Sequence, residues 1–137
     1  MQTTATSRIL LRLEGAALFA LSLVMYARSG SGWGTFAAWF LVPDISLAGY
    51  LLGPRVGAVT YNTLHSEIGP VLLGMIALSG ALPSLLPIAL IWASHVGFDR
   101  ALGYGLKSMH SFSDTHLGPI GKAARSATAT PVASVAV

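Results

Sequence analysis

Hydrophobic residues run along the chain in four long stretches, separated by short linkers that contain Gly, Ser or Pro. The stretches cover residues 9–27, 33–53, 56–81 and 85–106. At about 1.5 Å per residue in a helix, each can cross a hydrocarbon core about 30 Å thick. Short connections place consecutive helices antiparallel. The pattern therefore predicts an all-α fold, an integral membrane four-helix bundle.

Composition supports a membrane protein and removes several classes of site. The chain is 53% hydrophobic and 9% charged, whereas about a quarter of the residues in a soluble domain are charged. It has no Cys, which excludes disulfides, thiolate nucleophiles, iron–sulfur clusters and Cys-ligated zinc. The net charge of +3 is small, so we expect no nucleic-acid partner.

Basic residues predict the orientation of the bundle. With four crossings, both chain ends and the second linker lie on one side, and this side carries seven of the eight basic residues, against Arg28 alone on the other. The seven are Arg8, Arg12, Arg55, Arg100, Lys107, Lys122 and Arg125. The positive-inside rule then gives N-in and C-in. We expect a membrane domain over residues 1–121 and a mobile, cytoplasmic tail over 122–137, where Ser, Ala and Thr dominate.

Ionisable residues are unusually frequent inside the apolar stretches. Four of the five acidic residues and two of the four His lie there: Glu14, Asp44, Glu67, Asp99, His65 and His95. Each charged group at membrane depth costs roughly 2.5 to 3.5 kcal/mol unless it meets a partner or water. Counted from the inner ends of the helices, Asp44, His65, His95 and Asp99 fall about 10 to 17 Å from the inner surface. They are expected to meet in one layer, with Glu14 within reach.

This set has the composition of a metal site. His95 and Asp99 are spaced i, i+4, so one helix face presents both. Two imidazoles and two carboxylates favour zinc first, then manganese or ferrous iron. Pro43 and Pro70 interrupt the helices beside Asp44 and His65. Tyr61 and Asn62 precede His65 by four and three residues and are candidate hydrogen-bond partners for it.

Structural interpretations of the same residues remain open. A His–Asp hydrogen bond that pins two helices together explains His95 and Asp99 equally well. Asp99 can pair with Arg100 or Arg55, and Glu14 can pair with Arg12, as ion pairs near the interface.

The sequence resembles a small bacterial membrane-protein family catalogued as domain of unknown function 4260. The resemblance covers nearly all of residues 10–121. It is carried by residues 11–15, Pro43-Asp44-Ile45-Ser46, Gly49-Tyr50, Gly53-Pro54-Arg55, Tyr61-Asn62 with His65, residues 95–100 and 103–107, Phe112 and residues 114–118. This resemblance implies a multi-pass protein of the bacterial inner membrane and assigns no activity.

A more distant resemblance concerns chemistry. The order Pro-Asp, an isolated His, then His-x-x-x-Asp before a Gly-containing turn is similar to YdjM-like membrane-bound metal-dependent hydrolases. By position, that resemblance implies the ligands Asp44, His65, His95 and Asp99. That family has a further His in the segment that precedes His65 here, so one of its ligands has no counterpart.

Three functions remain in competition. The first is a metal-dependent hydrolase acting on a phosphoester or lipid headgroup, with Glu14 as general acid or base and Arg100 binding a phosphate or carboxylate. The second is a non-catalytic membrane scaffold whose polar cluster specifies packing or binds a partner, with the chain from Lys107 onward providing the contact. The expected partners are membrane lipids, a second copy or another membrane protein. The third is a proton or ion carrier, which we rank last because the chain has no internal repeat.

One further segment is a candidate lid. Asp114 and His116 follow the last apolar stretch, flanked by Phe112 and Leu117. An acid-x-His unit near a membrane surface is usually solvated. If the two apolar residues dock the segment on the bundle, Asp114 or His116 is expected to serve as a lid, as a hydrogen-bond partner of His95, or as a replacement for the ligand that has no counterpart before His65.

Overall fold

The computed structural model describes residues 5–109 and 112–120. The predicted tail over residues 122–137 lies outside the described residues.

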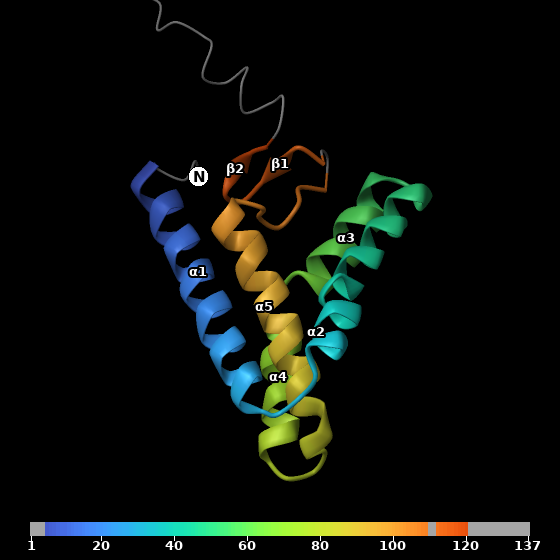
Figure 1. Cartoon of the computed structure of the whole chain (residues 1–137). Coiled ribbons are helices and arrows are strands. Elements are labelled where there is room, and N and C mark those ends of the chain that lie inside the picture. Colours follow the sequence, from blue (N-terminus) through green and yellow to red (C-terminus); the bar gives the residue numbers. More distant parts are fainter. Residues whose placement is uncertain (1–4, 110–111, 121–137) are drawn as a thin grey trace, which may run out of the picture.

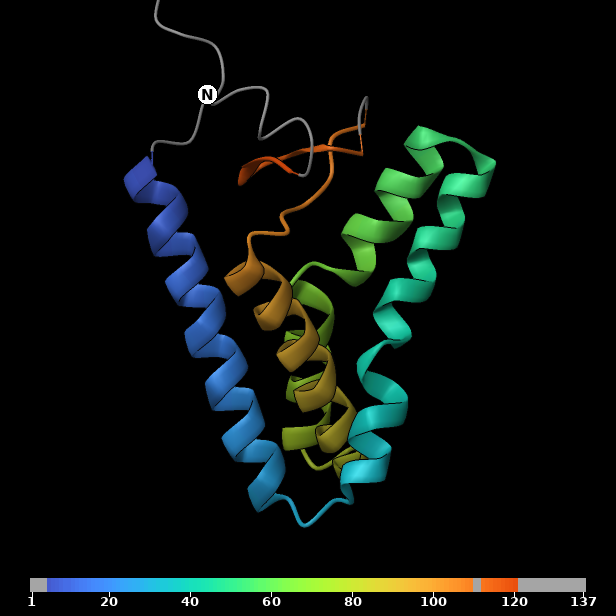
Figure 2. The same ribbon diagram turned by 45° about the horizontal axis from the view of Figure 1, so that its top comes forward.

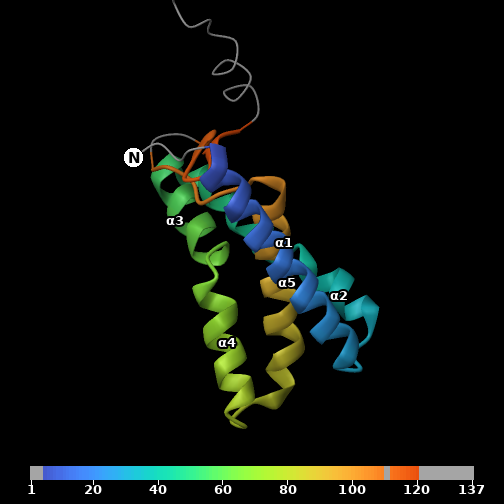
Figure 3. The ribbon, with the colours of Figure 1, turned by 90° about the vertical axis from the view of Figure 1, so that its left-hand side faces the viewer.

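The described chain passes up and down four times (Figure 1). Helix α1 (Ala5–Arg28) forms the first pass, and α2 (Trp33–Phe40) with the 3-10 helix η1 (Val42–Leu52) forms the second. The third consists of α3 (Pro54–Leu64) and α4 (Ile68–Leu78). A short 3-10 turn, η2 (Pro83–Leu85), leads into α5 (Leu86–Leu102), which runs beside α4 as a hairpin (Figure 3). The predicted antiparallel four-helix bundle is confirmed.

Three helical runs among the described residues are long and apolar enough to cross a membrane: Ala5–Arg28, Trp33–Leu52 and Pro83–Leu102. The third pass differs from the predicted continuous helix over 56–81, because it is interrupted between α3 and α4. The integral membrane character follows from these three helical runs.

Prolines explain both irregular passes. A proline cannot donate to the carbonyl four residues earlier, and its ring clashes with that carbonyl. For Pro70 this carbonyl belongs to Ser66, within the break. For Pro43 it belongs to Trp39, next to the end of α2 at Phe40. The helix breaks therefore fall a few residues before each proline.

The last helix is shorter than predicted. It ends at Leu102 rather than near residue 106, because Gly103 adopts a left-handed conformation with φ of 98°. The Tyr104 amide then donates to the Asp99 carbonyl at 2.8 Å. This closed helix end turns the following residues across the end of the bundle.

Close helix packing joins α1 to α5. A Cβ atom at Gly97 would lie 2.6 Å from the Phe19 amide nitrogen and 2.8 Å from the Gly15 carbonyl oxygen. Since no real side chain tolerates such contacts, the glycines allow the two backbones to approach. This packing fixes α5, which carries two of the candidate ligands.

The described chain ends in a small antiparallel hairpin of β1 (Asp114–Thr115) and β2 (Gly118–Pro119). Lys107 also pairs with Thr115 in an isolated β-bridge. Both views place the hairpin near the end of α5, between the first turns of α1 and α3 (Figure 1, Figure 2). The described residues thus begin and end at the same end of the bundle.

Candidate metal centre

The four predicted ligands converge at one point. Asp44, His65, His95 and Asp99 each offer one ligand atom, and these atoms lie within 4.8 Å of one another. The two imidazole Nε2 atoms are 3.1 Å apart. Asp44 Oδ1 lies 3.3 Å from Nε2 of His65 and 3.6 Å from Nε2 of His95. Asp99 Oδ2 lies 3.6 Å and 3.9 Å from the same two atoms.

Most of these separations are close to those expected for four ligand atoms around one ion. Ligand atoms held about 2.0 to 2.2 Å from a zinc ion lie about 3.3 to 3.6 Å from one another in a regular tetrahedron. Five of the six separations, from 3.1 to 3.9 Å, bracket this range, and the sixth, between the two carboxylate oxygens, is at most 4.8 Å. The arrangement requires no large movement to surround one ion.

Each ligand is placed by a specific local feature. Asp44 lies at the start of η1, just past the end of α2. His65 is the C-cap residue of α3, at the break before α4. His95 and Asp99 share one face of α5, as the i, i+4 spacing predicts. Two helix interruptions and one continuous helix therefore build the cluster.

The backbone fixes the tautomer of His65. Its Nδ1 lies 3.0 Å from the Tyr61 carbonyl oxygen, which can only accept, so Nδ1 carries the proton. The His65 Nε2 lone pair then faces the cluster, as a metal ligand requires. The Tyr61 ring stacks on the imidazole with centroids 3.7 Å apart, and its hydroxyl donates to Asp99 Oδ2 at 3.3 Å. Tyr61 therefore contacts both His65 and Asp99, but its hydroxyl bonds Asp99 rather than His65.

His95 is held differently. Its ring meets Phe40 edge-on with centroids 5.3 Å apart, and its buried Nδ1 has no hydrogen-bond partner in the described part of the chain. The predicted partnership with Asp114 or His116 is not present there. With its Nδ1 unpartnered, His95 is oriented by packing and by its Nε2 contacts.

Asn62 and Arg100 serve other contacts than those predicted. The Asn62 amide exchanges two hydrogen bonds with the Lys107 backbone, at 2.9 and 2.6 Å, rather than supporting His65. The buried Arg100 guanidinium donates to the carbonyls of His65 and Tyr104, each at 2.9 Å. Because a helix end leaves carbonyls without partners, Arg100 stabilises the break at His65. Its predicted phosphate-binding role stays a prediction.

Glu14 lies apart from the four ligands. It is exposed on α1 and is not among the residues that meet at the cluster. The alternative ion pairs of Asp99 with Arg100 or Arg55, and of Glu14 with Arg12, are also absent among residues 5–109 and 112–120. The catalytic role predicted for Glu14 stays a prediction.

The predicted docking of residues 112–117 does occur, at the end of α5. The Leu106 amide donates to His116 Nδ1 at 2.8 Å, and Thr115 and Leu117 are buried. Asp114 is exposed, and neither Asp114 nor His116 belongs to the four-residue cluster.

Lys107 is a feature that the sequence analysis missed. Its ammonium lies 4.0 Å from the Phe112 ring centroid and 5.2 Å from that of Tyr61, and the residue is 5% exposed. Burial lowers the pKa of Lys107, while the charge of Asp99 partly opposes this shift. The residue therefore links the hairpin to Tyr61, which in turn supports two ligands. From the sequence, a lysine at a predicted helix end is expected to anchor the helix at the membrane interface. Only the helix end at Gly103 could have indicated that Lys107 folds back toward Tyr61.

The model of a domain of unknown function, DUF4260, matches residues 8–120. The chain belongs to this family. The match contains all four ligands and the hairpin. No curated protein and no solved structure matches the chain. The more distant resemblance to YdjM-like hydrolases stays a prediction.

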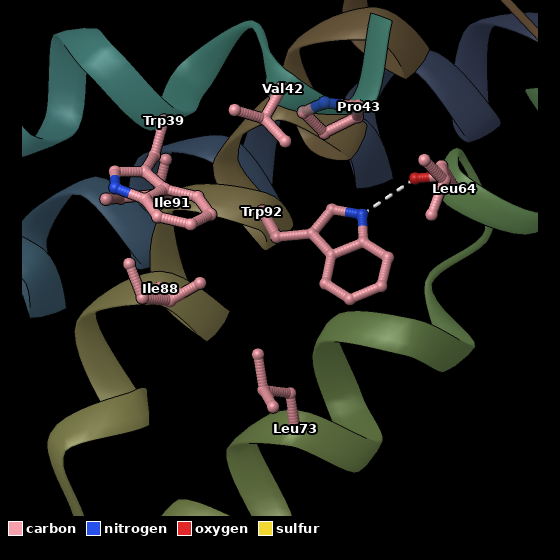
Figure 4. Close-up of a pocket in the computed structure, with 8 residues that line it drawn as sticks. All are labelled: Trp39, Val42, Pro43, Leu64, Leu73, Ile88, Ile91 and Trp92. Atoms are coloured by element: carbon pink, nitrogen blue, oxygen red, sulfur yellow. Dashed lines mark hydrogen bonds between the residues drawn. The ribbon is translucent and has the colours of Figure 1, made fainter. Parts of the chain in front are cut away.

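This DUF4260 protein has an apolar cavity of about 180 Å³, whose lining residues Figure 4 shows. The cavity adjoins the cluster, because Pro43 and Leu64, the residues directly before two of the candidate ligands, form part of its wall. The remaining lining residues are Trp39, Val42, Leu73, Ile88, Ile91 and Trp92. The Trp92 indole donates to the Leu64 carbonyl at 2.7 Å and so ties α5 to the end of α3. The cavity next to the cluster is therefore lined by apolar and aromatic residues.

Proposed function

We propose that Asp44, His65, His95 and Asp99 bind one divalent metal ion inside the membrane domain, zinc first and manganese or iron next. The observation that carries this proposal is that the four ligand atoms lie within 4.8 Å of one another, five of their six separations being between 3.1 and 3.9 Å. The tautomer of His65 supports it, because Nε2 presents a lone pair to the centre of the cluster.

The function favoured for this centre is metal-dependent hydrolysis of a phosphoester or lipid headgroup. A bound metal of this kind supplies a Lewis acid and an ionised water at neutral pH. The side chains of His65 and His95 are 0% and 3% exposed, whereas that of Asp44 is 39% exposed, so a substrate would approach beside Asp44. The adjoining apolar cavity suits the hydrocarbon part of a lipid.

The proposed setting is the bacterial inner membrane with both chain ends in the cytoplasm. Five basic residues lie toward the end of the bundle where the described chain begins and finishes: Arg8, Arg12, Arg55, Arg100 and Lys107. Arg28 lies at the other end of α1. Because cytoplasmic segments carry an excess of Lys and Arg, this asymmetry favours a cytoplasmic location for the end of the bundle with the five basic residues.

A structural metal site is the second candidate. Four protein ligands fill a tetrahedral shell, as in structural zinc sites, whereas catalytic zinc usually keeps one position for water. In this case the ion would fix the packing of η1, α3 and α5, and the protein would act as a membrane scaffold.

Metal analysis of the purified, detergent-solubilised protein tests the proposal. We expect about one zinc, manganese or iron per chain, and loss of that metal in His95→Asn, because each ligand contributes to one shared ion. Glu67→Gln is the matched control, since Glu67 is an exposed acid in the break between α3 and α4, next to His65 but outside the four-residue cluster. A wild-type protein that takes up none of these metals, even when each is supplied, overturns the proposal.

Hydrolysis is tested separately on the metal-loaded protein with phospholipid in mixed micelles. Release of phosphate or a headgroup, lost in Asp44→Asn, supports the hydrolase. Bound metal with no turnover on any phospholipid headgroup supports the structural site instead.

A further inference from the structure

A second cavity lies at the end of the bundle where the described chain begins and finishes. It measures about 440 Å³ and is bordered by the first turns of α1, the end of α5 and the hairpin. Its lining includes two basic residues and several apolar ones, among them Arg8, Arg12, Leu102, Leu117 and Ile120. None of the four proposed metal ligands lines this cavity.

The two arginines are arranged to act together. Arg8 and Arg12 are spaced i, i+4 on α1, so their side chains project from one face. The Arg12 Nε donates to the Ala101 carbonyl at 2.9 Å, which fixes the guanidinium while leaving its two terminal nitrogens as donors. Two guanidinium groups beside one cavity match the oxygen atoms of a phosphate group.

The hairpin shapes the cavity around Arg8. Gly118 has a φ of 111°, and a Cβ atom there would lie 3.3 Å from Arg8 Nη1. The absent side chain lets the backbone of the hairpin pass close to the guanidinium. The folded hairpin therefore forms one wall of the site.

The charges in this cavity have no compensating acid. No Asp or Glu lines it, and neither arginine forms an ion pair with another residue of the described ranges. The other walls are largely apolar, including Ile9, Leu102 and Leu117. The site therefore suits a ligand that combines an anion with hydrocarbon.

Position identifies the source of such a ligand. Two membrane-length helical runs reach their ends here, at Ala5 and Leu102. Basic pockets between membrane helices at this level recognise anionic lipid headgroups. We propose that the cavity binds the phosphate of an anionic phospholipid through Arg8 and Arg12, with the acyl chains leaving between α1 and the end of α5. This site is independent of the proposed metal centre.

Binding of phosphatidylglycerol to the full chain in detergent tests the proposal. Native mass spectrometry and thermal unfolding are measured with phosphatidylglycerol, with phosphatidylcholine and with inorganic phosphate alone. We expect phosphatidylglycerol to be retained and to stabilise the protein, and the other two to have little effect. Equal effects of the two lipids, or protection by inorganic phosphate without protection by phosphatidylglycerol, overturn the proposal.

Variants locate the site. Arg8→Gln with Arg12→Gln should weaken phosphatidylglycerol binding about tenfold or more, because both charge-assisted hydrogen-bond donors are lost. Arg28→Gln, an exposed arginine at the opposite end of α1, is the matched control and should change binding less than about twofold. Should the double variant fail to fold, Arg8→Gln alone still tests the site, since Arg8 is exposed and bonds no backbone carbonyl in the described chain. An equal loss in Arg28→Gln, or no loss in Arg8→Gln, contradicts the proposal.

Discussion

The first and third passes of the bundle place ionisable residues in opposite ways. Helix α1 is continuous over 24 residues, and its Glu14 is exposed. The third pass is broken between α3 and α4, and its His65 is fully buried at the cluster. Residue counting predicts similar membrane depths for Glu14 and His65. Of the two, only His65 belongs to the four-residue cluster. Depth in a membrane helix follows from residue number, whereas direction depends on which face of the helix packs inward.

The contacts of each pass explain the difference. In α1 the inward face is taken by Gly15, whose position leaves no room for a side chain against Arg100. Glu14 is one residue away and so points about 100° from that face. In the third pass, the break frees the His65 carbonyl for Arg100 and turns the imidazole toward Asp44. A helix break, unlike an unbroken helix, can direct both a side chain and a carbonyl inward.

Replacing one ionisable side chain in each pass by alanine should give the largest difference in metal affinity. We expect His65→Ala to lower metal affinity by more than about 100-fold, since even residues that only support a ligand cost 10- to 100-fold. Glu14→Ala should leave metal content unchanged, because its exposed carboxylate lies outside the cluster. Titration with zinc in the presence of a competing chelator measures both. Equal losses in the two variants would show that depth alone governs the site.

Repairing the helix break is the next test. Pro70→Ala restores an amide that can donate to the Ser66 carbonyl, so the third pass should become more continuous and His65 should rotate away from Asp44. We expect metal affinity to fall about 10- to 100-fold while helicity by circular dichroism rises.

Pro87→Ala is the control for that experiment. Pro87 also lies in the first turn of a helix, but η2 precedes α5 whereas the break that carries His65 precedes α4, so metal affinity should remain within about twofold. Unchanged affinity in Pro70→Ala would mean that the break is not what orients His65.

Sequence reasoning predicted the bundle and the meeting of Asp44, His65, His95 and Asp99, but not every contact around them. Residue counting and i, i+4 spacing suffice for His95 and Asp99, because both lie on a regular helix. The role of Asn62 was wrong because its partner, the Lys107 backbone, lies 45 residues away and meets it only after the chain turns at Gly103. Periodicity carries no information on such contacts, nor on the exposure of Glu14, which depends on how α1 packs against α5.

The hairpin offers a finer comparison between a docked segment and the chain beyond it. Truncation after Lys107 removes Thr115, which pairs with Lys107, and removes Phe112 from above its ammonium. Because Lys107 contacts Asn62 and Tyr61, metal affinity should fall by up to about tenfold. Truncation after Lys122 keeps the hairpin and should leave the affinity unchanged. Equal affinities of the two truncated proteins would exclude the hairpin from support of the site.

The smallest expected effect is a pH dependence of hairpin docking. Burial and the charge of Arg100 lower the pKa of His116 below its usual 6.5, and the charge of Glu67 opposes them more weakly. His116 Nδ1 accepts from the Leu106 amide, and protonation of Nδ1 removes this acceptor. A lowered pKa means that the docked state favours the neutral imidazole. Docking is therefore complete above pH 6.5 and weakens as the pH falls through the lowered value.

Amide hydrogen exchange at Leu106 measures this effect. After correction for the intrinsic rate, its protection should decrease below pH 6.5, while the Tyr104 amide, bonded to the Asp99 carbonyl, keeps its protection. His116→Gln should abolish the difference, because glutamine has no titrating group in this range. If Leu106 protection is constant with pH in the wild type, the imidazole does not hold the hairpin. The buried side chains of Leu117 and Thr115 then hold it. In that case the hairpin docks by side-chain packing, as α1 does, and not by polar contacts of the kind made at His65.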